Sequence, residues 1–171
     1  MTSAYDGPRG LTMPARFTLI ICEQSQNWVV PLRLALARSV VASGAGGTCS
    51  PLVAGSDYRL VETRSAEDCL AALTDEPRAV VGVELTSTNC DAALALVRTM
   101  AERFAAARSV VLAARELAEF EWLARELGAA GYVISPRQLD EFLLIARRHW
   151  ASLPRPELGA AESAWATLPW K

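Results

Sequence analysis

The stretch from Ser109 to Trp150 restricts the fold most, because two short apolar runs alternate in it with two segments of helical periodicity. The run from Val110 to Ala114 has the length and composition of a buried strand, and a second brief strand is expected over 131–134. The segment between them carries apolar residues three and four positions apart, and Gly128 follows where such a helix would end. A last helix is expected over about 139–150. Strand, helix, strand and helix in so few residues predict a parallel sheet covered by helices.

The first part of the chain continues this alternation. Apolar runs predict strands over 17–22, 58–63 and 79–85; the first is nearly continuous, as in a central strand, and the second alternates more, as near a sheet edge. Helices are expected from a cap at Asn27 to about Ala42, from a cap at Ser65 to about Leu73, and from Asn89 or Asp91 onward. Five strands therefore alternate with five helices.

The residues from Val110 to Arg148 resemble the last third of a response-regulator receiver domain of the CheY-like family. The order and spacing of Leu127-Gly128-Ala129, Tyr132 and Pro136 carry this resemblance, which covers roughly residues 16–150. It implies a flavodoxin-like (CheY-like) three-layer α/β/α fold, with a five-stranded parallel sheet of order 2-1-3-4-5. Residues 1–15 are then expected to be a flexible leader, 16–150 the receiver-like domain, and 151–171 a Trp-containing C-terminal tail.

The resemblance also implies where phosphoryl chemistry would lie, and these positions are altered. In receivers an acidic pair after the first strand binds Mg²⁺, an Asp ending the third strand accepts the phosphoryl group, and a Thr or Ser and a Lys hold it. Glu23 stands at the acidic pair, Glu84 at the acceptor, Ala113 at the Thr/Ser and Ser135 at the Lys. The chain's only lysine is Lys171, so no lysine can follow the fifth strand.

These substitutions predict a degenerate pseudo-receiver that lacks enzymatic activity, cofactor and metal. Glu84 has two interpretations: a permanent mimic of the charged, phosphorylated state, or a strand-end acid in a solvated loop. Asp91 lies too far beyond the third strand to be the acceptor, and it suits the first turn of the next helix.

Composition excludes several other classes. A net charge of −2 provides no basic field for nucleic acid or an anionic membrane, and no apolar run reaches the roughly 20 residues of a membrane helix. The N-terminal residues contain no apolar signal core, so a cytoplasmic location is expected.

The four cysteines, Cys22, Cys49, Cys69 and Cys90, form no CxxC pair, and reduced structural thiols are expected. His149 is expected to be a capping or surface residue near the end of the last helix.

Extra apolar side chains predict an interaction surface. Phe120 and Trp122 point about 200° apart on a helix, so one face cannot bury both. In receivers the face made by the fourth helix, the fifth strand and the fifth helix commonly mediates dimerisation or partner binding. The predicted surface consists of Phe120, Trp122, Tyr132, Phe142 and two tail residues, Trp165 and Trp170.

The sequence therefore favours a non-catalytic, receiver-like signalling protein that acts through a protein partner or through self-association. The alternative is a flavodoxin-like enzyme or small-ligand binder with its site at the strand ends near Glu23, Glu84 and Thr86. A conventional receiver that uses Glu84 as acceptor is a third hypothesis.

Overall fold

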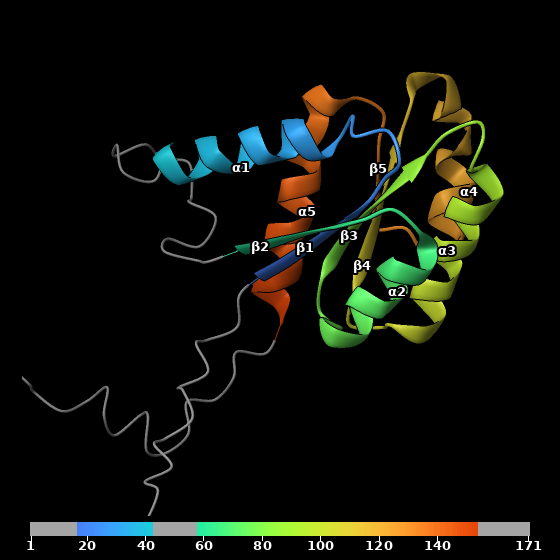
Figure 1. Ribbon diagram of the computed structural model, residues 1–171, viewed down its shortest axis with the longest axis horizontal. Helices are drawn as coiled ribbons and strands as arrows, with labels where there is room; N and C mark the ends of the chain where they lie inside the picture. Colours follow the sequence, from blue (N-terminus) through green and yellow to red (C-terminus); the bar gives the residue numbers. More distant parts are fainter. Residues whose placement is uncertain (1–16, 43–57, 154–171) are drawn as a thin grey trace, which may run out of the picture.

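The computed structural model describes residues 17–42 and 58–153, and within them strands and helices alternate (Figure 1). The strands are β1 (Phe17–Cys22), β2 (Tyr58–Thr63), β3 (Val80–Leu85), β4 (Arg108–Ala113) and β5 (Gly131–Val133). The α-helices are α1 (Val29–Ala42), α2 (Ala66–Asp75), α3 (Cys90–Arg103), α4 (Glu121–Glu126) and α5 (Leu139–Ser152). Two 3-10 helices, η1 (Arg115–Phe120) and η2 (Pro136–Gln138), precede α4 and α5.

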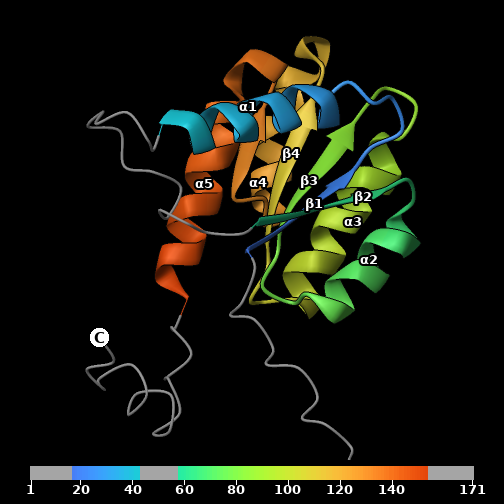
Figure 2. The same ribbon diagram turned by 60° about the vertical axis from the view of Figure 1, so that its left-hand side comes forward.

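The sheet is parallel and has the strand order β2-β1-β3-β4-β5, as the sequence predicts. Helices α1 and α5 cover one face, and α2, α3 and α4 cover the other (Figures 1 and 2). Every residue of β3 is buried, because this central strand has neighbours on both sides and helices on both faces. The fold is the flavodoxin-like, CheY-like one.

Two apolar clusters hold the helices to the sheet. One lies under α2, α3 and α4 and contains Ile20, Val81, Val83 and Met100. The other lies under α1 and α5 and contains Leu19, Ile21, Leu32 and Phe142. Neighbouring residues of one strand enter different clusters, as Leu19 and Ile20 do, because successive side chains of a strand point to opposite faces of the sheet.

Two helix boundaries follow local rules that are visible in the sequence. Ser65 caps α2, since its hydroxyl oxygen accepts a hydrogen bond from the Asp68 N–H at 3.1 Å. Gly128 ends α4 with a φ of +101°, a left-handed conformation that favours glycine. Its N–H donates to the Arg125 carbonyl oxygen, and the Ala129 N–H donates to the Ala124 carbonyl oxygen, each at 3.0 Å.

The fourth helical segment differs from its prediction. In place of one amphipathic helix, the chain forms η1 and then the short α4. Phe120, at the end of η1, is half-buried against the core, whereas Trp122 of α4 points outward, with 71 % of its surface exposed. The apolar residues spaced three and four apart, Leu117, Phe120, Ala124 and Leu127, nevertheless pack against the same core cluster, so the predicted stripe is present although the helix is divided.

His149 is another correction. It was expected at a cap or on the surface, yet it is 6 % exposed, and its Nε2 lies 3.1 Å from the Arg78 carbonyl oxygen. Burial lowers the pKa of His149 below its usual value, against the opposing effect of this hydrogen bond. The residue joins the end of α5 to the loop before β3.

Candidate functional site

The predicted site positions gather at one edge of the sheet, where all five parallel strands end. Glu23 directly follows β1, Glu84 is the penultimate residue of β3, and Ala113 is the last residue of β4. Ser135 follows β5 after one intervening residue. The side chains at this edge determine what the site can do, because ligands of open parallel sheets bind beyond the carboxyl ends of the strands.

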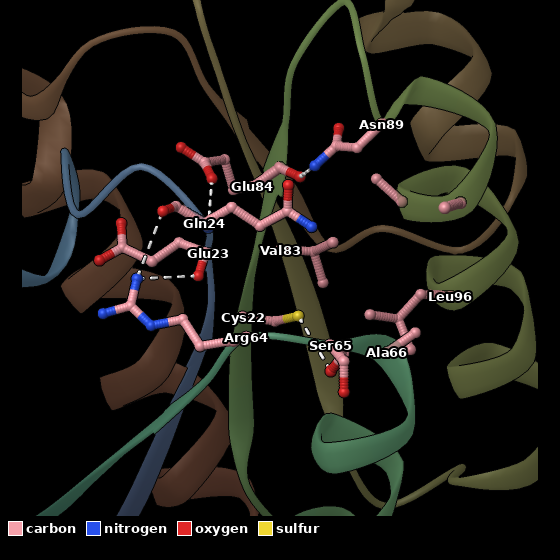
Figure 3. Close-up of a pocket in the computed structure, with 12 residues that line it drawn as sticks. Cys22, Glu23, Gln24, Arg64, Ser65, Ala66, Val83, Glu84, Asn89 and Leu96 are labelled. Carbon is pink, nitrogen blue, oxygen red and sulfur yellow. Dashed lines mark hydrogen bonds between the residues drawn. The ribbon is translucent and has the colours of Figure 1, made fainter.

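The Glu84 carboxylate is buried and holds the loop after β1. It is 3 % exposed, and one of its oxygens, Oε2, accepts hydrogen bonds from the backbone N–H groups of Gln24, at 2.7 Å, and Ser25, at 3.2 Å. The Ser25 hydroxyl donates to its other oxygen, Oε1. Figure 3 shows the Glu84 side chain reaching from β3 toward the Gln24 backbone. Both oxygens therefore serve to connect β3 to the β1–α1 loop, and the expectation of a solvated strand-end acid is wrong.

The Glu23 carboxylate has a separate role at the start of α1. It is 2 % exposed and accepts hydrogen bonds from the N–H groups of Trp28, at 2.9 Å, and Val29, at 3.2 Å. These groups belong to the first turn of the helix, whose N–H groups have no partner within the helix. Glu23 thus supplies the cap that the sequence assigned to Asn27, and its negative charge suits the positive end of the helix dipole.

Together the two acids make a poor metal site. Mg²⁺ prefers several oxygen ligands in octahedral geometry, and the oxygens of both carboxylates already accept hydrogen bonds from the protein. Within residues 17–42 and 58–153, no group of three or more His, Cys, Asp or Glu side chains is arranged to hold a metal ion.

Ala113 and Ser135 provide little for an anion. Ala113 has no exposed surface and only a methyl group. Ser135 caps η2, because its hydroxyl oxygen accepts a hydrogen bond from the Arg137 N–H at 3.3 Å. An open cavity of about 410 Å³ lies beside these strand ends, and its lining includes Trp28, Glu84, Ala113 and Arg115. Trp28 is itself 4 % exposed and packs in the core cluster under α1 and α5.

A smaller cavity of about 60 Å³ lies between β1, β3 and the helices α2 and α3 (Figure 3). Arg64 closes one side of it, donating from one guanidinium nitrogen to the carbonyl oxygens of Glu23, at 3.2 Å, and Gln24, at 3.5 Å. Cys22 lines the same cavity, with its thiol 3.5 Å from the Ser65 carbonyl oxygen. Sequence reasoning did not place Arg64 here, although its position directly after β2 at the same edge was the available signal.

The predicted interaction surface is only partly exposed. Tyr132 is 5 % exposed, and its hydroxyl donates to the Leu117 carbonyl oxygen at 2.5 Å. Burial raises the pKa of Tyr132 to about 12. Phe142 has no exposed surface and lies in the core under α5. Both were wrongly assigned to the surface. Trp122 is strongly exposed, and Trp165 and Trp170 lie outside the described residues.

Comparisons with known proteins agree with the fold. No protein-family model and no curated protein sequence matches the chain. Solved structures of receiver domains do match, and these define the class of fold that the chain adopts.

A response regulator from Thermotoga maritima aligns with a TM-score of 0.60 and 17 % identity, over 81 % of this chain and 100 % of its own. A CheY-like protein, TadZ, from Pseudomonas aeruginosa aligns with a TM-score of 0.57 and 17 % identity, over 83 % of this chain and 99 % of its own. The receiver domain of NtrX from Brucella abortus aligns with a TM-score of 0.54 and 19 % identity, over 80 % of this chain and 99 % of its own. At these identities the likeness shows the fold alone.

Proposed function

We propose that this chain is a non-catalytic pseudo-receiver, a signalling protein that acts through protein–protein contacts and is not phosphorylated at the receiver position. The observation that supports this most is the engagement of Glu84. An acceptor carboxylate must present a free oxygen to the phosphoryl donor and to Mg²⁺. Both Glu84 oxygens instead accept hydrogen bonds from the β1–α1 loop.

The remaining positions support the same proposal. A phosphoryl group at this edge would be stabilised by a hydroxyl and an ammonium group, since both donate strong hydrogen bonds to its oxygens. The methyl group of Ala113 donates none, and the Ser135 side chain carries no charge. In this proposal the hydrogen bonds of Glu84 to the β1–α1 loop fix the conformation of the domain, and the surface that binds the protein partner forms without a phosphorylation step.

The contact surface is proposed to centre on Trp122 of α4. Its 71 % exposure leaves a large apolar ring in water, and Leu144 of α5 is also exposed, at 41 %. Aromatic residues of this kind are frequent anchors of protein interfaces. No helix in the described part of the chain has the length and apolarity needed to cross a membrane. The proposed partner is a protein with an apolar pocket, or a second copy of this chain.

The test is an amide NMR titration of the full chain with Mg²⁺ and beryllofluoride, a phosphoryl mimic, with a working receiver domain measured in parallel. We expect the amide signals of Glu23, Glu84 and Ala113 to stay in place, because no free carboxylate oxygen is available for the metal or the mimic. Saturable shifts at these residues that spread to Tyr132 and α5 would show a live phosphoryl switch and would refute the proposal.

The cavity of about 410 Å³ favours one second candidate, a small-ligand-binding protein. Its volume lies in the range of ligand pockets, and Thr86, Arg115 and Glu116 supply polar groups to its lining. A thermal-shift series with FMN and nucleotides separates the two functions. A melting temperature that rises and saturates with ligand would favour the binder, and an unchanged one favours the pseudo-receiver.

A further inference from the structure

Cys22 and Cys69 form a thiol pair beside the altered site. Cys22 is the last residue of β1, and Cys69 lies in the first half of α2. The Cys22 thiol lies 3.5 Å from the carbonyl oxygen of Ser65, the cap of α2, and Cys22 packs against the same apolar cluster that buries Cys69. The two thiols also lie close enough for each to shift the pKa of the other. No local pattern in the sequence predicts this contact, because 47 positions separate the two residues.

The two thiols differ in access. Cys69 has no exposed surface, whereas Cys22 is half-buried and lines the cavity of about 60 Å³. Figure 3 shows the Cys22 sulfur pointing away from the β1–α1 loop, toward Ser65 and the start of α2. A water molecule occupies about 30 Å³ in the liquid, so this cavity suits a reagent of one or two heavy atoms.

The contact also divides the roles of the two sulfurs. The interaction with Cys69, reinforced by the Thr63 hydroxyl against the effect of burial, lowers the pKa of the Cys22 thiol to about 7. Glu84 and Asp68 raise it by their charge but do not reverse the shift. The same interaction, with burial, raises the pKa of Cys69. Cys22 is also the thiol that the cavity reaches, so it is the attacking sulfur, and the fully buried Cys69 keeps its proton.

We propose that Cys22 and Cys69 are a peroxide-reactive dithiol, in which Cys22 attacks a hydroperoxide and Cys69 resolves the product to an intramolecular disulfide. In the first step, written for hydrogen peroxide, the Cys22 sulfur bonds to one peroxide oxygen, the O–O bond breaks, and the other oxygen leaves as hydroxide and takes a proton to become water. Cys22 is thereby oxidised to a sulfenic acid. In the second step the Cys69 sulfur bonds to the Cys22 sulfur, and the hydroxyl leaves with the Cys69 proton as a second water.

The disulfide would tie the end of β1 to α2, directly beside Glu23 and the loop that Glu84 holds. This inference stands apart from the proposed function, because it rests on the two thiols and not on the absence of phosphoryl chemistry. Cys90 provides a reference thiol, since it is partly exposed and its pKa is raised, by burial first and then by Asp91.

The test treats the reduced full chain with hydrogen peroxide and maps each cysteine by differential alkylation and mass spectrometry. We expect Cys22 and Cys69 to be lost together in one cross-linked species, about 2 Da lighter than the reduced chain and restored by dithiothreitol. Cys22 should react at least ~10-fold faster than Cys90 near neutral pH, because far more of it is thiolate. A C49S/C90S variant should form the same disulfide.

A C69A variant separates the two steps. Without the resolving thiol, Cys22 should stop at a sulfenic acid that dimedone traps, and this acid should form more slowly than in the wild-type chain, because the interaction with Cys69 that lowers the Cys22 pKa is lost. The alkylation map of the wild-type chain needs no substitution, so it tests the formation of the Cys22–Cys69 disulfide even if C69A does not fold. Oxidation of Cys22 no faster than that of Cys90, or over-oxidation of Cys22 while Cys69 stays reduced in the wild-type chain, would overturn the proposal.

Discussion

At the scale of single residues, Glu23 and Glu84 use buried carboxylates to hold backbone, where a working receiver uses carboxylates for metal and phosphoryl chemistry. Each accepts hydrogen bonds from two main-chain N–H groups. A buried carboxylate is costly unless such donors surround it, and both residues meet this condition. The two carboxylates therefore have structural roles at this edge of the sheet.

Glu84→Gln tests this role directly. Gln keeps the shape of the side chain and one acceptor oxygen, but it removes the negative charge and the second of the two acceptor oxygens that the N–H groups of Gln24 and Ser25 and the Ser25 hydroxyl share. We expect the free energy of unfolding, measured with urea, to fall by about 1.5–3 kcal/mol, the range for hydrogen bonds to a charged group.

The matched control for Glu84→Gln is Glu119→Gln, a change of the same chemistry at an exposed position of η1. It should alter the free energy of unfolding by less than about 0.5 kcal/mol. If the two variants were equally stable, the Glu84 carboxylate would not be the anchor of the β1–α1 loop.

At the scale of elements, α4 depends on the turn that ends it. Gly128 takes a positive φ, and a Cβ at this position would lie 2.6 Å from the Ala101 Cβ of α3. The turn thus brings α4 against α3 and directs the chain into β5. This is the residue that carries part of the receiver resemblance, and the structure gives its physical reason.

Gly128→Ala should therefore be destabilising for two reasons, the left-handed backbone and the contact with Ala101. We expect a loss of about 1–3 kcal/mol in the free energy of unfolding. The Ala101→Gly background separates the two effects, since it removes the contact but keeps the backbone strain. Gly128→Ala should cost less in that background, and an equal cost would show that the contact contributes nothing.

At the scale of the whole molecule, the described surface presents Trp122 on a well-packed fold. Trp122→Ser should leave the melting temperature within about 2 °C of the parent, because an exposed side chain contributes little to stability. It should, however, weaken binding to the proposed protein partner at least ~10-fold, as loss of an aromatic anchor does. Affinity capture from the source cells, followed by quantitative mass spectrometry, measures the change.

Val30→Ser is the matched control for Trp122→Ser. Val30 is also an exposed apolar residue, at 52 %, but it lies on α1, across the sheet from α4. Binding that survives Val30→Ser and not Trp122→Ser supports the proposed surface. Equal losses in both variants, or no loss in either, would contradict it.

The sequence determined the strands, the order of elements and most helix boundaries, because these follow from local periodicity and from residues such as Ser65 and Gly128. Through the family resemblance, it also located Glu23, Glu84, Ala113 and Ser135 at one edge. Such properties depend on neighbours within a few positions along the chain, so a single sequence displays them.

The tertiary structure alone decided how those residues are used. Glu84 meets Gln24 across 60 positions, His149 meets Arg78 across 71, and Cys22 meets Cys69 when α2 packs on β1. Phe142 and Tyr132 are buried for the same reason: the packing of helices on the sheet determines which apolar faces remain open. Contacts between distant segments arise from the parallel topology, and no local pattern encodes their geometry.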